Sequence, residues 1–365
     1  MPEQPRFLIA GGGTGGHIIP ALAIADELRA QFGADILFVG TARGLESRLV
    51  PQAGYRLELI RAGQLNRVSL GTRLRTLVDL PRGLFQCMGL LRSFRPDAVI
   101  GVGGYASGPM MGAAILKRVP TLAFEPNAVP GMANRLVGRW VKAAAVNFAP
   151  AAQYFRGAQV TGIPVRAEFF RLEARSAGAA RHLLVFGGSQ GARVLNATMP
   201  KIATALLEAV PGLTILHQAG ARHAEATLAA YQASSAPGER WRVAAFLDDM
   251  PKRFEAADLV LARSGASTVA ELCAAGKPAV LIPFPQAADD HQRRNAEVLA
   301  QAGAAEMLLE AQLTEDRLLE TLTNLLRSPD ALREMAEKAR TLAHPDAVKR
   351  IAGMAMEIAE RAVKQ

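Results

Sequence analysis

One local pattern occurs twice in the chain, and it restricts the fold more than any other feature. Residues 6–28 read RFLIAGGGTGGHIIPALAIADEL: an apolar segment, a glycine cluster and a helical pattern. Residues 181–207 repeat that order as RHLLVFGGSQGARVLNATMPKIATALL. A buried strand joined to a helix by a glycine turn is typical of the start of a doubly wound parallel sheet. The repetition therefore predicts two such domains in tandem.

Short apolar runs alternate with longer helical patterns after each copy, as in ADILFVG and DAVIGVGG, or GLTILHQAG and PAVLIPFP. This alternation is typical of βαβ units, whose parallel sheet is covered by helices on both faces. A chain of 365 residues is also longer than one hydrophobic core usually supports. We therefore expect an α/β protein with two domains. Gly162 and Pro164 interrupt the pattern where the first domain is expected to end.

The composition limits the classes of protein to which the chain can belong. Half of the residues are hydrophobic and 21% are charged, as in a globular protein. No run of about 18 apolar residues predicts a membrane span, and the first residues lack a secretion signal. Cys87 and Cys273 lie in unrelated segments and are interpreted as reduced core residues of a cytoplasmic protein. The net charge of +9 indicates a polyanionic partner, whether nucleic acid, anionic lipid or a phosphorylated substrate.

The first glycine cluster matches G-x-G-x-x-G in residues 11–16, a signature of dinucleotide-binding turns. A nicotinamide site also needs an acidic residue about 20 residues further on, at the end of the second strand. That strand ends at residues 39–41 without a carboxylate, and Glu46 follows only after a basic turn. The sequence therefore disfavours a nicotinamide-dependent oxidoreductase, which stays an alternative.

Two later segments suit a nucleotide. In FGGSQGA (residues 186–192) the glycines permit close approach of the backbone, Ser189 supplies a hydroxyl, and the following helix directs its N-terminus at an anion. In RSGASTVAEL (residues 263–272) the carboxylate of Glu271 can accept both hydroxyls of a ribose. Each segment also has a purely structural alternative: Ser189 as a helix N-cap, and Thr268 with Glu271 as a capping box.

Seven motifs follow one another along the whole chain. They are GGGTGGHIIPALAIADEL, GGYASGP, FEPNAVPGMANR, TGIPVR, FGGSQGARVLN, RSGASTVAEL and DDHQ. In this order and at these spacings the chain resembles the MurG family, the family 28 glycosyltransferases of peptidoglycan synthesis. The resemblance implies the GT-B fold, with two Rossmann-like doubly wound domains facing across a cleft. It implies an acceptor- and membrane-facing domain of residues 1–162 plus 344–365, the latter a returning helix, and a UDP-GlcNAc-binding domain of residues 163–343.

The resemblance also implies the reaction. GlcNAc moves from UDP-GlcNAc to the C4 hydroxyl of the muramic sugar of lipid I, with inversion, giving lipid II for cell-wall growth, cell shape and division. The residues that match the family's substrate-binding positions are Thr14, Gly15 and Gly16 beside the acceptor, Asn127 and Gln292 at the GlcNAc hydroxyls, Arg166 and Ser189 at the diphosphate, Leu247 at the uracil, and Ala266, Ser267, Thr268, Val269, Ala270 and Glu271 around the nucleoside. From residue type alone, Asn127 is a turn residue and Arg166 a surface charge.

Inverting transfer needs a base for the attacking hydroxyl and stabilisation of the departing UDP. His17 follows the first glycine cluster, and histidine can take up a proton near neutral pH. Glu125 in FEPNA is the rival base, or a structural anchor of that turn. No Asp-x-Asp motif occurs, so helix N-termini and Arg166 are expected to stabilise the leaving group, with no bound metal and no cofactor.

Arginines flank apolar residues between positions 61 and 95, where the apolar stripe includes Leu84, Met88 and Leu91. Basic side chains beside such a stripe suit an anionic membrane surface, as a polyprenyl-linked acceptor requires. The predicted contacts are Arg73, Arg75, Leu77, Arg82 and Phe85. The expected location is then peripheral, at the cytoplasmic face of the inner membrane. The alternative is an ordinary helix with a solvated basic face.

One further function stays open beside the oxidoreductase. A UDP-GlcNAc epimerase on the same scaffold would bind the donor without needing an acceptor or a lipid surface. Nucleic-acid binding is disfavoured, because only 5% of the residues are aromatic and no reader motif occurs. The sequence does not indicate an oligomeric state.

Overall fold

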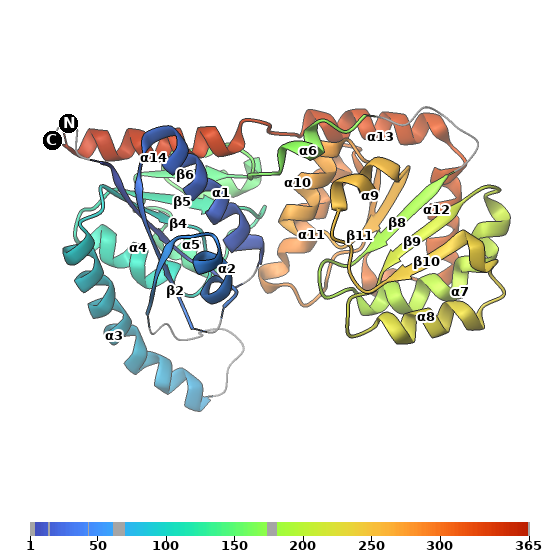
Figure 1. The fold of residues 1–365 in the computed structure, drawn as a ribbon, viewed down its shortest axis with the longest axis horizontal. Coiled ribbons are helices and arrows are strands. Elements are labelled where there is room, and N and C mark those ends of the chain that lie inside the picture. Colours follow the sequence, from blue (N-terminus) through green and yellow to red (C-terminus); the bar gives the residue numbers. More distant parts are fainter. Residues whose placement is uncertain (1–3, 14, 43, 61–69, 174–180, 364–365) are drawn as a thin grey trace. The chain divides into compact units, whose positions relative to one another are not determined.

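The computed structural model describes residues 4–13, 15–42, 44–60, 70–173 and 181–363, with the main chain alone for 70–81 and 362–363 (Figure 1). The chain divides into two compact units. Unit 1 comprises Met1–Pro164 and Asp346–Gln365, and unit 2 comprises Val165–Pro345. Each unit contains one sheet, and every pairing between described strands is parallel. The predicted α/β class with two doubly wound sheets is confirmed.

The sheet of unit 1 has seven described strands in the order β3-β2-β1-β4-β5-β6-β7. They are β1 (Arg6–Ala10), β2 (Asp35–Gly40), β3 (Arg56–Leu59), β4 (Ala98–Gly101), β5 (Thr121–Glu125), β6 (Ala143–Val146) and β7 (Ala158–Val160). The helices are α1 (Gly15–Phe32), α2 (Glu46–Gln52), α3 (Leu70–Phe94), α4 (Ser107–Leu116), α5 (Met132–Val137), the 3-10 helix η1 (Ala149–Tyr154) and α14 (Ala347–Val363). The C-terminal helix α14 packs against α1 and against β4, β5 and β6, so the end of the chain completes the core of unit 1 (Figure 1).

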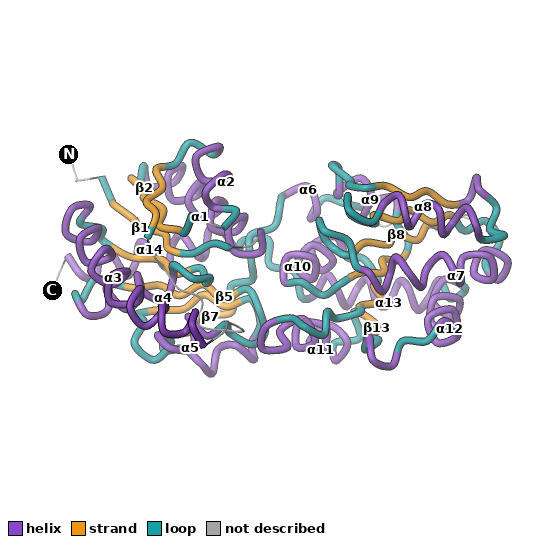
Figure 2. Tube along the Cα trace, turned by 90° about the horizontal axis from the view of Figure 1, so that it is seen from below, coloured by secondary structure: helices purple, strands orange, loops and turns teal. Residues whose placement is uncertain are grey.

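The sheet of unit 2 has six described strands in the order β10-β9-β8-β11-β12-β13. They are β8 (His182–Phe186), β9 (Thr214–Gln218), β10 (Trp241–Ala244), β11 (Leu259–Ala262), β12 (Ala279–Leu281) and β13 (Ala305–Met307). The α-helices are α6 (Ala167–Phe170), α7 (Arg193–Ala209), α8 (Ala224–Ala233), α9 (Met250–Ala256), α10 (Ala266–Ala275), α11 (His291–Gln301), α12 (Glu315–Leu326) and α13 (Pro329–Thr341), and the 3-10 helices are η2 (Gly238–Arg240), η3 (Ala288–Asp290) and η4 (Glu310–Gln312). Helices flank the strands in each unit (Figure 2).

The strand order reverses beside the first strand of each sheet, between β1 and β4 in unit 1 and between β8 and β11 in unit 2. The loops at the carboxyl ends of the two strands diverge at such a point, and open α/β sheets bind ligands there. The glycine clusters of residues 11–16 and 187–191 follow β1 and β8. Both glycine loops therefore lie where each sheet is suited to hold a ligand.

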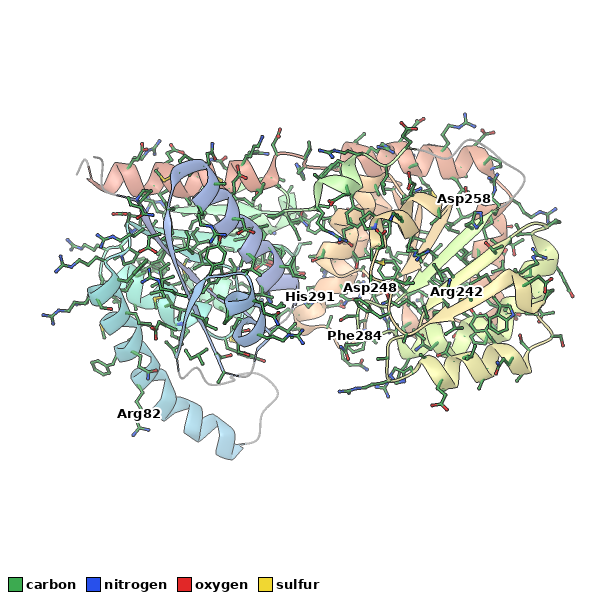
Figure 3. All side chains as sticks on the ribbon, in the orientation of Figure 1. Arg82, Arg242, Asp248, Asp258, Phe284 and His291 are labelled. Atoms are coloured by element: carbon green, nitrogen blue, oxygen red, sulfur yellow. The ribbon has the colours of Figure 1, made fainter. Side chains whose placement is uncertain are left out.

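Helix α3 presents different side chains to the core and to solvent. Leu84, Met88 and Leu91 pack against the core of unit 1. Phe85 is 71% exposed, and Arg82 points away from the helix into solvent (Figure 3). The predicted apolar stripe is therefore wrong for Leu84, Met88 and Leu91, because these side chains pack into the core of unit 1.

Candidate active site

The first glycine loop connects β1 to α1 at the switch point of unit 1. Residues 11–13 have φ values of 153°, 140° and 94°, a region that favours glycine. The Gly12 amide donates to the Gly103 carbonyl over 3.2 Å. A Cβ atom added to Gly104 would lie 2.2 Å from the Gly12 carbonyl oxygen. The loop after β1 is therefore fixed by direct backbone packing on the loop after β4.

The predicted acceptor-side residues follow this loop. Thr14 lies outside the described residues, whereas Gly15, Gly16 and His17 form the first turn of α1, where helix amides lack intrahelical acceptors. His17 is half-buried with its ring against Gly103, since a Cβ atom at that glycine would lie 3.0 Å from both Cδ2 and Nε2. The absence of a side chain at position 103 therefore provides the space that the imidazole occupies.

The carboxylate of Glu46, expected to lie too far from the end of β2 to contact it, is hydrogen-bonded to Thr41, directly after β2, and to the first glycine loop. Glu46 is 1% exposed. Its Oε2 accepts from the Gly13 amide at 2.7 Å, and its Oε1 accepts from the amide and hydroxyl of Thr41 at 2.9 and 3.0 Å. The premise that no carboxylate reaches the end of β2 is therefore wrong. The conclusion drawn from it still holds, because Glu46 is enclosed by protein donors and is not presented to a ribose.

Glu125, the last residue of β5, organises the turn that follows it. It is 2% exposed, and its Oε1 accepts from the amide and the side chain of Asn127 at 3.0 and 3.1 Å. Its Oε2 accepts from the Asn134 side chain at 2.9 Å and the Gly131 amide at 3.2 Å. Burial raises the pKa of Glu125, while these donors oppose the rise. Four donors on two oxygens are the geometry of a structural anchor, and they hold Asn127 at the carboxyl edge of the sheet.

The second glycine loop connects β8 to α7 at the switch point of unit 2. Gly191 has a φ of 73°, and a Cβ atom there would lie 1.8 Å from the Ala219 carbonyl oxygen. The loop is thus packed directly on the segment after β9. Ser189 is exposed in this loop, and the N-cap of α7 is Ala192. The interpretation of Ser189 as an N-cap is therefore wrong, because the helix begins one turn later.

The segment from Ala266 to Glu271 forms the start of α10, whose N-cap is Gly265. Thr268 is the third helical residue, so the capping box of Thr268 and Glu271 is wrong. Glu271 is half-buried, and burial raises its pKa to about 7, while the positive charge of Arg166 lowers it. Arg166 is exposed and precedes α6, which packs against α10. The fold thus brings Glu271, predicted to bind the ribose, close to Arg166, one of the two residues predicted for the diphosphate.

Two other residues predicted to bind the sugar-nucleotide donor, Gln292 and Leu247, each form a hydrogen bond within the protein. Gln292, in the first turn of α11, accepts a hydrogen bond on Oε1 from the Phe284 amide at 3.0 Å. The side chain of Phe284 is exposed (Figure 3). The Leu247 amide, in the loop after β10, donates to Gln218 at 3.0 Å. Nothing in the local sequence marks Gln218 as part of this site.

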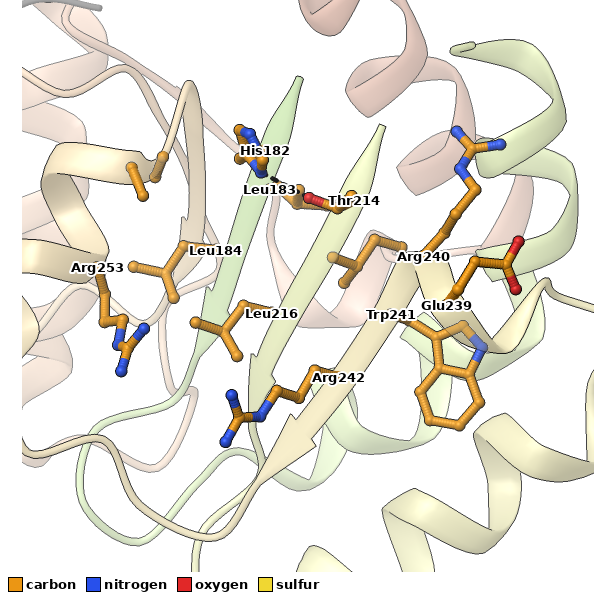
Figure 4. A pocket seen from close by; sticks show the side chains of 13 residues that line it. His182, Leu183, Leu184, Thr214, Leu216, Glu239, Arg240, Trp241, Arg242 and Arg253 are labelled. Atoms are coloured by element: carbon orange, nitrogen blue, oxygen red, sulfur yellow. Dashed lines mark hydrogen bonds between the residues drawn. The ribbon is translucent and has the colours of Figure 1, made fainter. Parts of the chain in front are cut away.

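A cavity of about 260 Å³ lies elsewhere in unit 2 (Figure 4). Its lining includes His182, Thr214 and Trp241, the first residues of β8, β9 and β10. It therefore lies at the amino ends of these strands, at the edge of the sheet opposite to the glycine loop, and it is separate from the candidate site.

Within the part of the chain that the structure describes, no three His, Cys, Asp or Glu side chains are grouped so as to hold a metal ion. None of the described helices has both the length and the apolar character needed to cross a bilayer.

Comparisons with known proteins agree over both units. The N-terminal domain of glycosyltransferase family 28 matches residues 7–146, and the C-terminal domain of that family matches residues 182–351. A relative from Solibacter usitatus is 44% identical over 97% of this chain and 96% of its own length. It is named UDP-N-acetylglucosamine--N-acetylmuramyl-(pentapeptide) pyrophosphoryl-undecaprenol N-acetylglucosamine transferase.

Solved structures show the same fold. The crystal structure of Acinetobacter baumannii MurG covers 97% of this chain and 99% of its own, with 33% identity and a TM-score of 0.82. A putative UDP-N-acetylglucosamine 2-epimerase from Listeria monocytogenes has a TM-score of 0.68 at 15% identity over 95% of each chain, which shows a shared fold alone. With matches to both halves of one family and near-complete coverage by its members, the chain belongs to glycosyltransferase family 28 and has the GT-B architecture of two Rossmann-like units.

Proposed function

We propose that this chain transfers GlcNAc from UDP-GlcNAc to the C4 hydroxyl of the muramic sugar of lipid I, with inversion, to form lipid II. The observation that supports this most is the 44% identity, over almost the whole of both chains, with a transferase named for these substrates. The residues at the two switch points suit the same chemistry. The product would supply cell-wall growth, and with it cell shape and division.

Unit 2 is proposed to bind the donor. Arg166, Ser189 and the N-terminus of α7 supply the positive charge and donors that a diphosphate needs. The carboxylate of Glu271 accepts the ribose hydroxyls, and the start of α10 (Ala266, Ser267, Thr268, Val269 and Ala270) lies against the nucleoside. Leu247 contacts the uracil through its backbone, and Gln292 contacts the GlcNAc.

Unit 1 is proposed to bind the acceptor through Thr14, Gly15 and Gly16, and Asn127 to contact the GlcNAc hydroxyls. His17 takes the proton of the C4 hydroxyl as that oxygen bonds to C1 of GlcNAc. The bond from C1 to the diphosphate oxygen breaks at the same time, and its electron pair stays on UDP. Arg166 and the α7 amides stabilise the charge that develops there. His17 is favoured over Glu125 as the base, because both oxygens of Glu125 already accept two hydrogen bonds each.

The function is tested by incubating the protein with UDP-GlcNAc, with and without a lipid I analogue. UDP release that depends on the acceptor is the expected result. Conversion of UDP-GlcNAc to an isomer without acceptor would instead identify an epimerase, and a change in NADH absorbance would identify an oxidoreductase. A Glu271→Ala variant, measured in parallel, excludes a contaminating enzyme as the source of the signal.

We also propose that unit 1 binds an anionic membrane surface at the cytoplasmic face of the cell membrane, as a peripheral protein. Arg82 and Phe85 are both exposed on α3. Helix α4 packs against α3 and α5. Leu116 at the end of α4, Leu136 in α5 and Trp140 after α5 are exposed as well. Large apolar side chains beside arginines suit a lipid surface better than water. Arg73, Arg75 and Leu77 belong to the same helix, in the part whose side chains are not described.

Membrane binding is tested with the double variant Arg82→Glu/Phe85→Asp and vesicles containing phosphatidylglycerol. We expect the partition coefficient to fall about 10- to 100-fold, because a basic residue near the surface contributes about 1 kcal/mol and a buried phenyl ring more. Arg222→Glu/Leu228→Asp makes the same change of charge at an exposed arginine and an exposed large apolar residue of unit 2, and it is expected to bind as the wild type. Equal loss in both variants, or in neither, would argue against α3 as the contact.

A further inference from the structure

Gln218, the last residue of β9, connects two loops of unit 2 through one side chain. It is 3% exposed. Its Nε2 donates to the Gly188 carbonyl at 2.9 Å, in the glycine loop after β8. Its Oε1 accepts from the Leu247 amide at 3.0 Å, in the loop after β10. Strands β8 and β10 lie on either side of β9, so the amide of Gln218 spans the carboxyl ends of three neighbouring strands.

The segment after Gln218 is packed into the same connection. The Ala219 amide donates to the Ala244 carbonyl at 2.9 Å, and the Ala219 carbonyl accepts from the Asn196 side chain at 2.8 Å. That carbonyl also lies where a side chain at Gly191 would have to be. The glycine loop and the end of β10 are thus both attached to residues 218–219.

We propose that Gln218 is a positioning residue that holds the glycine loop and the Leu247 loop at a fixed separation, so that the two ends of one nucleoside diphosphate bind together. This inference rests on the proposed function, which assigns the diphosphate to the first loop and the nucleobase to the second. A ligand that engages both loops gains from their preorganisation, whereas a fragment that engages one loop does not.

Glutamine is suited to this role because it has one acceptor and two donors on one planar group. Methionine has a similar length and neither strong group, so Gln218→Met leaves the Leu247 amide and the Gly188 carbonyl without their partner. Glutamate retains an acceptor for the Leu247 amide but presents no donor to the Gly188 carbonyl. Gln218→Glu therefore releases the glycine loop alone, and it provides a second variant if Gln218→Met folds poorly.

Calorimetric titration with UDP, uridine and inorganic pyrophosphate tests the proposal. For both variants we expect UDP affinity to fall about 10- to 100-fold, as one or two lost hydrogen bonds predict, while uridine and pyrophosphate affinities each change less than about threefold. The KM for UDP-GlcNAc is expected to rise with little change in kcat. Tyr231→Phe is the matched control, because it removes a buried hydrogen bond to His217, next to Gln218, without touching either loop.

The outcomes are distinguishable. UDP affinity at the wild-type level in both variants would overturn the inference. So would equal losses for UDP and for both fragments, because a general loss of structure affects all three ligands alike. Failure of the wild-type protein to bind UDP would instead overturn the proposed function, and this inference with it.

Discussion

Replacing His17 with alanine is expected to lower kcat by about 10²- to 10⁴-fold, the range that general-base catalysis contributes. The imidazole lies against Gly103, beside the carboxyl ends of β1 and β4. The KM for UDP-GlcNAc is expected to change less than about threefold, because unit 2 is proposed to bind the donor. Initial rates of UDP release, with donor varied at saturating lipid I analogue, measure both quantities.

Glu125→Gln is the matched control for the rival base. In Glu125→Gln, an amide nitrogen replaces one oxygen and faces two N–H donors, so two hydrogen bonds are lost. We therefore expect a lower melting temperature. The His17→Ala variant is expected to keep the wild-type melting temperature and to regain part of its rate with added imidazole. Unchanged kcat in His17→Ala, or a loss of kcat in Glu125→Gln without a loss of stability, would identify Glu125 as the general base instead of His17.

Features that depend on neighbouring residues were predictable from the sequence. The clusters at residues 11–16 and 187–191 follow strands and precede helices, because short-range periodicity specifies a strand, a turn and a helix. The exact starts of the helices were not predictable. The N-caps of α7 and α10 are Ala192 and Gly265, which have extended backbones and no capping side chain, whereas Ser189 and Thr268 have the residue types that usually take this place.

Contacts between residues far apart in the sequence were missed. Gln218 bonds to residues 30 and 29 positions away, and Glu46 to one 33 positions away. No local pattern distinguishes Gln218 from an exposed polar residue. One signal for Glu46 was present, since Gly40 and Gly44 precede it closely and a Cβ atom at either would collide with its side chain. A glycine whose backbone conformation any residue could adopt can therefore indicate that a neighbouring side chain packs against it.

Replacing Glu271 with alanine is expected to raise the KM for UDP-GlcNAc about 10²-fold, because two hydrogen bonds to a charged acceptor contribute at least about 1.5 kcal/mol each. A KM close to the wild-type value in Glu271→Ala would show that Glu271 does not bind the ribose. Glu271→Gln retains one acceptor oxygen and is expected to fall between alanine and the wild type.

The same carboxyl group predicts how donor binding varies with pH. Its pKa is raised to about 7 by burial, so the acceptor with two charged oxygens is lost as pH falls below 7. The KM for UDP-GlcNAc is therefore expected to rise below pH 7 in the wild type, by up to about tenfold per pH unit, until it reaches the KM of Glu271→Gln, which is expected to stay flat. Both phosphates of UDP-GlcNAc are esterified and do not titrate in this range, so the profile reports the protein. A pH-independent KM in the wild type would contradict this role.

Stability is expected to vary with pH in the opposite direction to donor binding. The folded protein holds a proton on Glu271 up to a pKa of about 7, above the ordinary value of 4.5 that applies to the unfolded chain. The folded state therefore binds more protons between these values, and the free energy of unfolding falls as pH rises from 4.5 to 7. Glu271→Gln lacks this dependence, so it is expected to be more stable than the wild type above pH 7 while binding the donor less well. On the proposed function, the ribose hydroxyls of the donor would stabilise the charge of this carboxylate, so we expect donor binding to offset the stability that Glu271 costs above pH 7.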